Sequence, residues 1–342
     1  MIEKYAILLK EKWKCLKFVS AKKGMFIVMY YIGIDLGGTN VAVGIVTEEG
    51  RIIAKKSFKT AAERPFEEII KDMADCIEVL LSENKISLDE IESIGIGSPG
   101  NVNSETGVLV YANNFAHGKN VPMRTLLQQY IHKPVILGND ANVAALGEVL
   151  AGAGKGYSNV VMITLGTGVG GGIVIDKKIY EGEYSAGAEL GHICICHGGE
   201  TCSCGRKGCW EAYASATALI RQTKAAMQAN PDSLMNQTAT LDKISGRTAF
   251  DAAKKGDPAA QEVVDRYIEY IAEGLTDICN IFRPEILIIG GGICNEGDYL
   301  LKPIQAFVDS YIYGGERNPK QRIAVAALGN DAGIIGAALN RR

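Results

Sequence analysis

Two stretches of the chain share one pattern of apolar positions interrupted by glycines. Residues 30–46 are apolar and β-branched, break at two adjacent glycines and resume, which predicts a β-hairpin. Residues 161–175 repeat this pattern about 130 residues later, with Thr164 at the position of Asp35. Two strand–glycine turn–strand units at this separation predict a duplicated lobe.

Elsewhere the apolar residues follow a helical period. A helix is predicted over residues 66–81, after Pro65, and a second one from Pro258 to the Arg283-Pro284 pair. Residues 331–339 are small and apolar, which is typical of a helix that packs closely. Strands that alternate with helices in this way indicate an α/β fold with ligand loops at the strand ends.

Three further strands each end in residues that suit a ligand. The strand at 94–98 ends in Ser98-Pro99-Gly100, and the strand at 286–289 ends in Gly290-Gly291-Gly292. The strand at 135–139 enters a helix directly, with Asp140 at the junction. Asp140 at this position is either a helix N-cap or a carboxylate at a ligand site, which the helix dipole would hold ionised. The N–H groups of the glycine turns are suited to holding phosphate.

The composition limits the classes of protein that fit. At 342 residues, with 47% apolar and 22% charged residues, the chain is long enough for two globular domains. A net charge of −3 argues against a nucleic-acid surface, and no apolar run approaches the ~20 residues of a membrane span. Nine cysteines without a secretory signal favour the cytoplasm.

The first 28 residues do not match the pattern that follows. They carry seven lysines among apolar residues, and Met25 and Met29 lie immediately before the first strand. We interpret residues 1–28 as a leader outside the fold. A basic amphipathic helix that touches a membrane or a partner is the alternative.

Cysteines and one histidine form the strongest metal-binding pattern. Three cysteines have the spacing C-x-C-x4-C, a histidine lies ten residues before them, and zinc prefers four such ligands. We therefore predict a structural zinc ion bound by His192, Cys202, Cys204 and Cys209. Cys194, Cys196 and His197 are also in reach, and three buried cysteines beside a surface histidine are the alternative without metal. The second ring nitrogen of His192 is free for a hydroxyl-rich ligand, and Glu189 and Glu211 flank the same stretch.

Taken together, these motifs resemble the ROK family of repressors and sugar kinases, most closely its bacterial glucokinases. The resemblance covers about residues 29–342 and rests on the motifs D-L-G-G-T-N, S-P-G, G-N-D-A-N, L-G-T-G-V-G-G-G, E-L-G-H and C-x-C-G-x-x-G-C-x-E. It implies an actin-like ATPase fold, in which two lobes of the ribonuclease-H type surround a central cleft. The small lobe would comprise residues 29–138 with 330–342, and the large lobe, with the zinc site, residues 139–329.

The resemblance also implies roles for single residues. It makes Asp140 the catalytic base. The substrate ligands would be Ser98, Gly100, Asn114, Asn139, Glu189, His192 and Glu211. The ATP site would comprise Asp35, Gly37, Gly38, Thr39, Asn40, Gly166, Thr167, Gly168, Gly290, Gly291 and Gly292. His117 stands where the family often has tryptophan, and Asn113 where it often has proline, so the sugar-side loop departs from the family pattern.

These observations predict an ATP-dependent hexose kinase that phosphorylates the 6-hydroxyl of glucose, with ATP, Mg²⁺ and structural Zn²⁺. Kinases for N-acetylmannosamine, N-acetylglucosamine or fructose share the motifs, and a non-catalytic sugar sensor on the same fold is the alternative of another class. The resemblance further implies a homodimer, and we expect no nucleic acid or membrane partner. Family repressors carry a DNA-binding domain, for which a 28-residue leader is too short.

Overall fold

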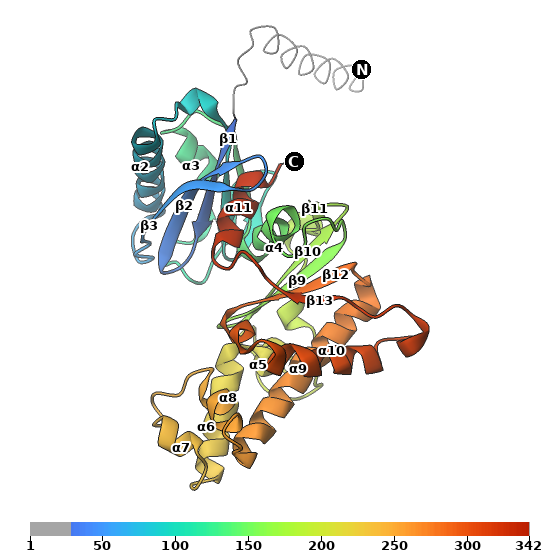
Figure 1. Ribbon diagram of the computed structural model, residues 1–342. Coiled ribbons are helices and arrows are strands. Elements are labelled where there is room, and N and C mark those ends of the chain that lie inside the picture. The colour runs from blue at the N-terminus through green and yellow to red at the C-terminus, as the bar shows by residue number, and fades with distance from the viewer. Residues whose placement is uncertain (1–28, 342) are drawn as a thin grey trace.

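The structure, a computed structural model, describes residues 29–341. The leader predicted at residues 1–28 therefore lies outside the described residues. The described chain forms two lobes, one above the other in Figure 1, and each lobe is built on a five-stranded sheet.

The sheet of the first lobe contains the first predicted hairpin. Strands β1 and β2 are antiparallel and pair Leu36 with Val41, which leaves residues 37–40 to make the turn. Strand β3 continues the antiparallel side, while β4 and β8 run parallel to β1, so that β1, β4 and β8 end at one edge. The order across the sheet is β3-β2-β1-β4-β8. The bounds are β1 (Tyr30–Leu36), β2 (Asn40–Thr47), β3 (Ile52–Lys59), β4 (Ile91–Ser98) and β8 (Val135–Asn139).

The sheet of the second lobe repeats this plan strand for strand. Its order is β11-β10-β9-β12-β13, with β9, β10 and β11 antiparallel and β12 and β13 parallel to β9. The bounds are β9 (Val160–Leu165), β10 (Val169–Ile175), β11 (Lys178–Ile179), β12 (Ile286–Gly290) and β13 (Ile323–Val325). The duplication predicted from the two glycine hairpins is confirmed.

Helices cover both sheets. In the first lobe, the predicted amphipathic helix is α2, which follows Pro65 and buries one face against β2 and β3. In the second lobe, α9 starts at Asp257, whose side chain accepts the N–H of Ala260, and packs against α5, α6, α8 and α10. The bounds are α2 (Phe66–Asn84), α3 (Met123–Gln128), α4 (Asp140–Ala151), α5 (Glu211–Ala214), α6 (Ala216–Ala229), α7 (Met235–Thr238), α8 (Thr248–Ala253), α9 (Pro258–Phe282), α10 (Asp298–Tyr311) and α11 (Asp331–Leu339).

Some elements have no clear signal in the sequence. A small antiparallel sheet follows β4 and consists of β5 (Asn101–Asn103), β6 (Val108–Tyr111) and β7 (Lys119–Val121). Helices α6 and α10 were not predicted either. Short 3-10 helices complete the fold: η1 (Leu88–Glu90), η2 (Glu183–Ser185), η3 (Leu190–His192), η4 (Gly292–Glu296) and η5 (Gly315–Arg317).

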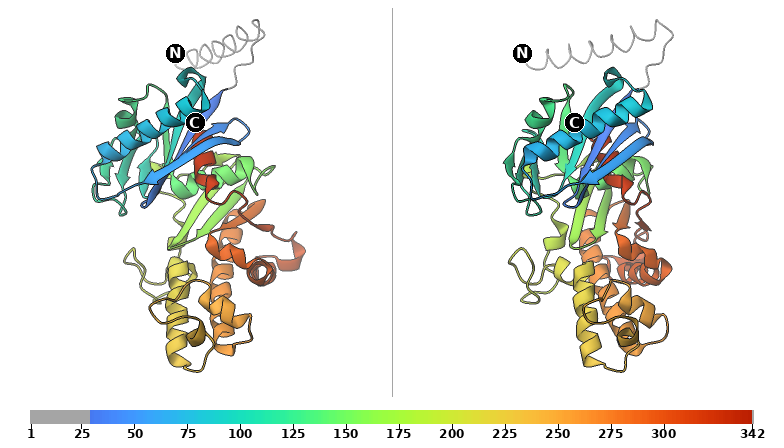
Figure 2. Two further views of the ribbon diagram at one scale, coloured as in Figure 1. Left: turned by 60° about the vertical axis from the view of Figure 1, so that its left-hand side comes forward. Right: turned by 90° about the vertical axis from the view of Figure 1, so that its left-hand side faces the viewer.

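Two helices each follow a strand of one sheet and pack on the sheet of the other lobe. Helix α4 follows the last strand of the first sheet but packs mainly on β9 and β10 of the second. Helix α11 follows the last strand of the second sheet but packs on β1, β2 and β4 of the first, and α4 and α11 pack on each other (Figure 2). The division into residues 29–138 with 330–342 and residues 139–329 stays a prediction, and the position of α11 on the first sheet supports it.

The crossing of α4 and α11 depends on glycine. A Cβ atom on Gly336 would lie 1.6 Å from the carbonyl oxygen of Val143, and one on Gly147 would lie 2.3 Å from that of Ala332. Both distances are far below van der Waals contact, so the helices approach backbone to backbone. No other residue type fits at these two positions without moving the lobes apart.

This contact leads to a stability prediction. In Gly336→Ala the methyl group must separate α4 from α11, and we expect a loss of unfolding free energy at or above the upper end of the ~1–3 kcal/mol usual for overpacking. Urea unfolding measures it. The matched control is Gly246→Ala, because a Cβ there meets no atom within 4 Å. Equal stability of the two variants would contradict the inferred contact.

Candidate active site

The first glycine turn joins β1 to β2. Within it, the N–H of Gly37 donates to the carbonyl of Asn40 at 3.0 Å. The N–H groups of Gly38 and Thr39 donate to no group within residues 29–341. The turn therefore presents backbone donors without partners, which is what an anion requires.

The second glycine turn joins β9 to β10 in the equivalent place. The N–H of Gly166 donates to the carbonyl of Gly168 at 3.0 Å, whereas those of Thr167 and Gly168 have no acceptor in the described part of the chain. The start of α6 supports the turn, since the N–H of Ala216 donates to the Gly166 carbonyl at 2.8 Å and the Thr217 hydroxyl to the Thr167 carbonyl at 2.8 Å.

The third turn, Gly290 to Gly292, follows β12 next to the second turn. Gly290 pairs with Thr164 of β9, and Gly291 has a φ of 104°, a conformation that favours glycine. This turn thus lies at the same sheet edge as the Gly166 turn.

Two carboxylates lie between the lobes, close enough to repel each other. Asp35 is in β1 and Asp140 is the first residue of α4. Burial raises the pKa of Asp35 to about 6, and the charge of Asp140 adds to the shift. Burial also raises the pKa of Asp140, and the N–H of Ala141, which donates to Oδ1 at 2.8 Å, offsets only part of that effect.

Desolvation of Asp140 thus opposes the effect of the helix dipole on its pKa, and the ionisation of this carboxyl at neutral pH stays a prediction. The N-cap of α4 is Asn139, whose Oδ1 accepts the N–H groups of Ala141 and Asn142 at 3.0 and 3.2 Å. Asp140 is thus left without the capping role. A carboxylate with a raised pKa is also a stronger general base.

The residues of the first lobe that were predicted to bind the sugar differ in exposure and in the hydrogen bonds that their side chains already make. The side chain of Asn139 is also engaged through Nδ2, which donates to the carbonyl of Gly100 at 3.2 Å. Ser98 is fully buried and its hydroxyl lies 3.2 Å from the Pro99 carbonyl, so this side chain takes part in the turn, and its contact with the sugar stays a prediction. Asn114 is exposed, and its Cβ lies 3.3 Å from where a Cβ on Gly38 would be.

The structure brings together the four side chains predicted to bind a metal. One ligand atom from each of His192, Cys202, Cys204 and Cys209 lies within 4.8 Å of the others. Cys204 Sγ is 3.7 Å from Cys209 Sγ, and Cys202 Sγ is 3.6 Å from His192 Nδ1. Cys194, Cys196 and His197 are not part of this cluster; Cys194 Sγ lies 3.9 Å from the Lys207 carbonyl.

Glu211 links this cluster to the second glycine turn. Its Oε1 accepts the Ser203 hydroxyl at 2.9 Å, and its Oε2 accepts the N–H of Val169 at 3.1 Å. A Cβ on Gly168 would lie 2.2 Å from Oε2, so the carboxylate lies directly against the turn. The preceding residue, Trp210, is fully buried and donates through Nε1 to the Tyr270 carbonyl at 2.7 Å, which anchors the start of α5 on α9.

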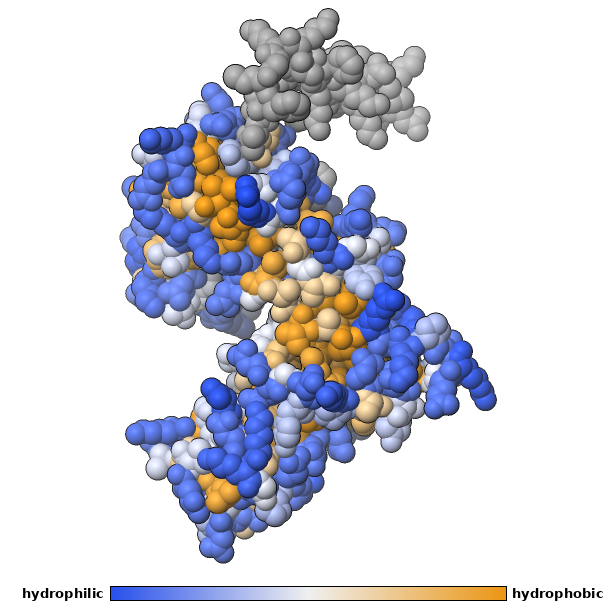
Figure 3. All heavy atoms as spheres, viewed as in Figure 1, coloured by the Kyte–Doolittle hydropathy of each residue, from blue (hydrophilic) through white to orange (hydrophobic). Residues whose placement is uncertain are grey.

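The space-filling view in Figure 3 shows an indentation between the lobes, and both glycine hairpins end on this side of the molecule in Figure 1. Glu189 is exposed at the start of η3, and the Nδ1 of His192 faces the thiols, so Nε2 is on the other side of the ring.

Sequence reasoning missed the residues that hold the turns in place. They are Thr60 for the first turn, Thr217 for the second, and Ser203 for Glu211. Each is a single hydroxyl residue, in a connection between elements or, for Thr217, in the first turn of α6. No spacing distinguishes such a residue from other surface serines and threonines.

Comparison with known proteins agrees with the motifs. The ROK family profile matches residues 31–340. A glucokinase of Thermotoga maritima is 39% identical over 308 residues, which cover 90% of this chain and 95% of that protein.

Two solved structures are similar as well. A ROK family glucokinase from Streptomyces griseus in complex with glucose and AMPPNP has a TM-score of 0.75 and 36% identity, covering 90% of this chain and 98% of that one. A ROK family transcriptional regulator, a homologue of the E. coli MLC protein, has a TM-score of 0.79 and 26% identity, covering 91% and 77%. The predicted actin-like fold is confirmed.

The carboxylate pair leads to a prediction on stability and pH. The folded-state pKa of Asp35, about 6, exceeds that of an unfolded aspartate, about 3.9. The folded state binds the proton more tightly, so this group lowers stability as the pH rises from about 4 to 6. Asp35→Asn should therefore be more stable than wild type by about 1–3 kcal/mol at pH 7.5, and by much less at pH 4.5.

Urea unfolding at both pH values tests this expectation. Asp298→Asn is the matched control, because the Asp298 side chain is 76% exposed. A stability gain for Asp35→Asn that is the same at both pH values would argue against the raised pKa.

Proposed function

The chain belongs to the ROK family, and we propose that it is an ATP-dependent hexose kinase that phosphorylates the 6-hydroxyl of glucose. One observation carries the proposal: Asp140, relieved of helix capping by Asn139, lies beside Asp35 between two turns with free N–H groups. The T. maritima and S. griseus glucokinases support glucose as the hexose.

Asp140 is the proposed general base. A sugar hydroxyl is a weak nucleophile at neutral pH, so a carboxylate must accept its proton as it attacks the terminal phosphorus. Burial raises the pKa of Asp140, which makes its carboxylate a stronger base. The carboxyl can accept a proton only while it is ionised. Activity should therefore fall when the pH is lowered far enough to protonate Asp140.

The glycine turns are the proposed phosphate sites. The N–H groups of Gly38, Thr39, Thr167 and Gly168 would stabilise the charge that develops on the phosphoryl group. Mg²⁺, when bound with ATP, neutralises phosphate charge. Asp35 suits a cation there, because a positive charge would compensate two buried carboxylates that repel each other.

The proposed sugar ligands come from both lobes. Asn114 and the Asn139–Gly100 pair lie on the first lobe, and Glu189, His192 and Glu211 on the second. Carboxylates accept hydrogen bonds from individual hydroxyls and the imidazole can donate or accept one, so such a set can distinguish a fixed array of hydroxyls. Lobe closure would then exclude water as a competing acceptor.

We further propose that the Cys and His cluster holds structural zinc. Tetrahedral zinc, with Zn–S of about 2.3 Å and Zn–N of about 2.1 Å, separates two sulfurs by about 3.8 Å and sulfur from nitrogen by about 3.6 Å. The Cys204–Cys209 and Cys202–His192 separations are 3.7 and 3.6 Å. Burial raises the pKa of Cys209 to about 12, so a cation is needed to keep it a thiolate.

A sugar-responsive regulator is the second candidate, favoured by the fold match to the family regulator. A sensor needs neither a base nor free phosphate turns. Assaying ADP release with glucose and ATP distinguishes the two functions directly.

The assembly and the compartment stay proposals. No helix in residues 29–341 is long and apolar enough to cross a membrane. The eight cysteines of the described part are free thiols, which supports the cytoplasm. The homodimer predicted from the family resemblance is tested by sedimentation.

The role of Asp140 predicts the effect of one substitution. Asp140→Asn keeps the size of the side chain but cannot accept a proton, so kcat should fall by about 10²–10⁴. Glucose binding, measured by calorimetry, should change little. The Asp298→Asn variant again serves as control, and an Asp140→Asn enzyme with more than a third of wild-type kcat would exclude this base.

The metal site predicts a selective loss. Cys204→Ser should lose the zinc and with it the orientation of His192 and Glu211, which would raise the glucose KM by roughly 10–100-fold. The ATP KM should rise far less, because Ala216 and Thr217 still hold the second turn.

The matched control is Cys194→Ser, in the same stretch but outside the cluster, which should retain about one zinc per chain by metal analysis. A zinc-free Cys204→Ser protein with a normal glucose KM would remove these residues from the sugar site.

A further inference from the structure

The first glycine turn is held from outside by the segment between β3 and α2. Thr60, fully buried, donates through its hydroxyl to the Gly37 carbonyl at 2.6 Å and through its N–H to the Thr39 carbonyl at 3.0 Å. One residue therefore fixes the carbonyls at both ends of the Gly37–Thr39 stretch.

These two bonds orient the N–H groups of the turn. In a trans peptide the C=O and the following N–H point in opposite directions, and the described chain contains no cis peptide. With the Gly37 carbonyl directed at Thr60, the N–H of Gly38 points away from Thr60. That N–H is one of the donors without a partner, so Thr60 sets the direction of a phosphate-binding group.

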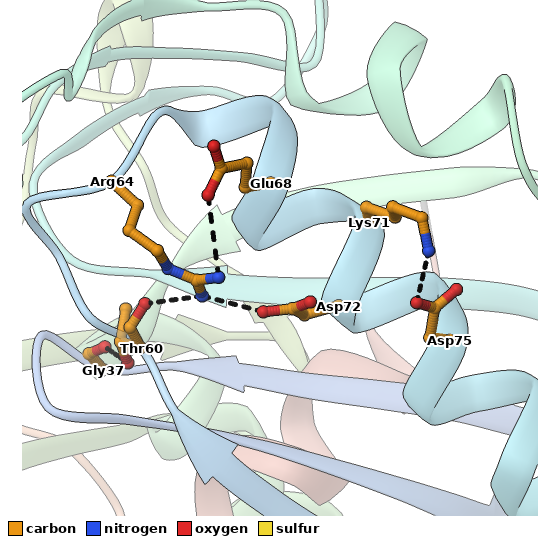
Figure 4. A network of polar contacts seen from close by, with 7 residues as sticks. All are labelled: Gly37, Thr60, Arg64, Glu68, Lys71, Asp72 and Asp75. Carbon is orange, nitrogen blue, oxygen red and sulfur yellow. Dashed lines mark hydrogen bonds and ion pairs between the residues drawn. The ribbon is translucent and has the colours of Figure 1, made fainter.

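Thr60 is in turn fixed to α2 through Arg64. The guanidinium donates to the Thr60 carbonyl at 3.1 Å and to Asp72 Oδ2 at 2.7 Å, and it lies 3.9 Å from Glu68 (Figure 4). Asp72 and Glu68 are on the helix, so Arg64 ties the end of β3 to a rigid element. Arg64 makes no hydrogen bond to the turn itself and acts on it only through Thr60.

The same segment contacts the sugar-side loop by a separate bond. The carbonyl of Ala62 accepts the N–H of Ala116 at 3.0 Å, close to Asn114. This is a backbone bond, and substitutions of the Thr60 or Arg64 side chain leave it in place. The effects of the two bonds on ATP and on sugar can therefore be separated.

We propose that Thr60 is a positioning residue for the phosphoryl donor and that Arg64 acts through it. The inference rests on the proposed kinase function. Aligned donors do not have to reorganise when charge develops on the phosphate, and a turn free to rotate its Gly37–Gly38 peptide loses that advantage. Thr60 itself is not proposed to contact either substrate.

Thr60→Val is the decisive variant, because it keeps the shape of the side chain and removes only the hydroxyl donor. We expect its ATP KM to rise about 3–10-fold while the glucose KM stays within twofold. Thr60→Ser restores the hydroxyl and should return the ATP KM to near wild type. Arg64→Ala should show a smaller rise, and Thr60→Val/Arg64→Ala should be no worse than Thr60→Val alone, as expected for residues that act in series.

The control is Lys71→Ala, which removes the neighbouring ion pair with Asp75 on the same helix without touching this network (Figure 4). Its ATP KM should be that of wild type. Parallel rises of the ATP and glucose KM in Thr60→Val, or no rescue by serine, would overturn the proposal.

Hydrogen exchange gives a test that does not need turnover. Amides of residues 37–40 should exchange faster in Thr60→Val than in wild type, while those of residues 166–169 stay unchanged. If the wild-type protein phosphorylates no hexose, the kinase function fails, yet this measurement still decides whether Thr60 braces the turn. Unchanged exchange at residues 37–40 would overturn the proposal.

Discussion

The backbone contact between α4 and α11 is the constraint on which the rest of the structure depends. Each helix continues from one sheet and packs on the other, so the lobes are joined by a crossing that admits only glycine at Gly147 and Gly336. Asp140 opens α4, and the Asp35 carboxylate lies 2.7 Å from where a Cβ on Gly333 of α11 would be. The carboxylates therefore meet because these two helices meet, and a shift at the crossing would move the site.

Holding two carboxylates in this place carries a cost in stability. Burial raises the pKa of both, so ionising these carboxyls inside the fold costs free energy. A proton or a cation relieves the strain, and a bound nucleotide with its metal would supply the cation. The site is thus least stable when empty, which is what a site shaped for a charged substrate requires.

Much of this arrangement was readable from the sequence, for a physical reason. A pair of glycines between two β-branched segments strongly favours a β-hairpin. The spacing of the cysteines around Cys204 is typical of a metal site. Which residue caps α4 was not readable, because Asn139 and Asp140 are equally good caps and only packing decides between them. Strands β5 to β7 were missed because they are too short to show a period. Thr60 was missed because its role depends on the folded sheet, in which β2 pairs with both β1 and β3 and so brings Thr60, after β3, next to the first glycine turn.

The first two glycine turns are each also in contact with a residue that we predict to bind the sugar. On the first lobe Asn114 lies against Gly38, and on the second Glu211 accepts the N–H of Val169. A hexose that orders Asn114 and Glu211 would therefore restrict both phosphate turns, and a nucleotide that orders the turns would restrict the sugar ligands. The duplicated sheets thus bring one predicted sugar ligand against the glycine turn of each lobe.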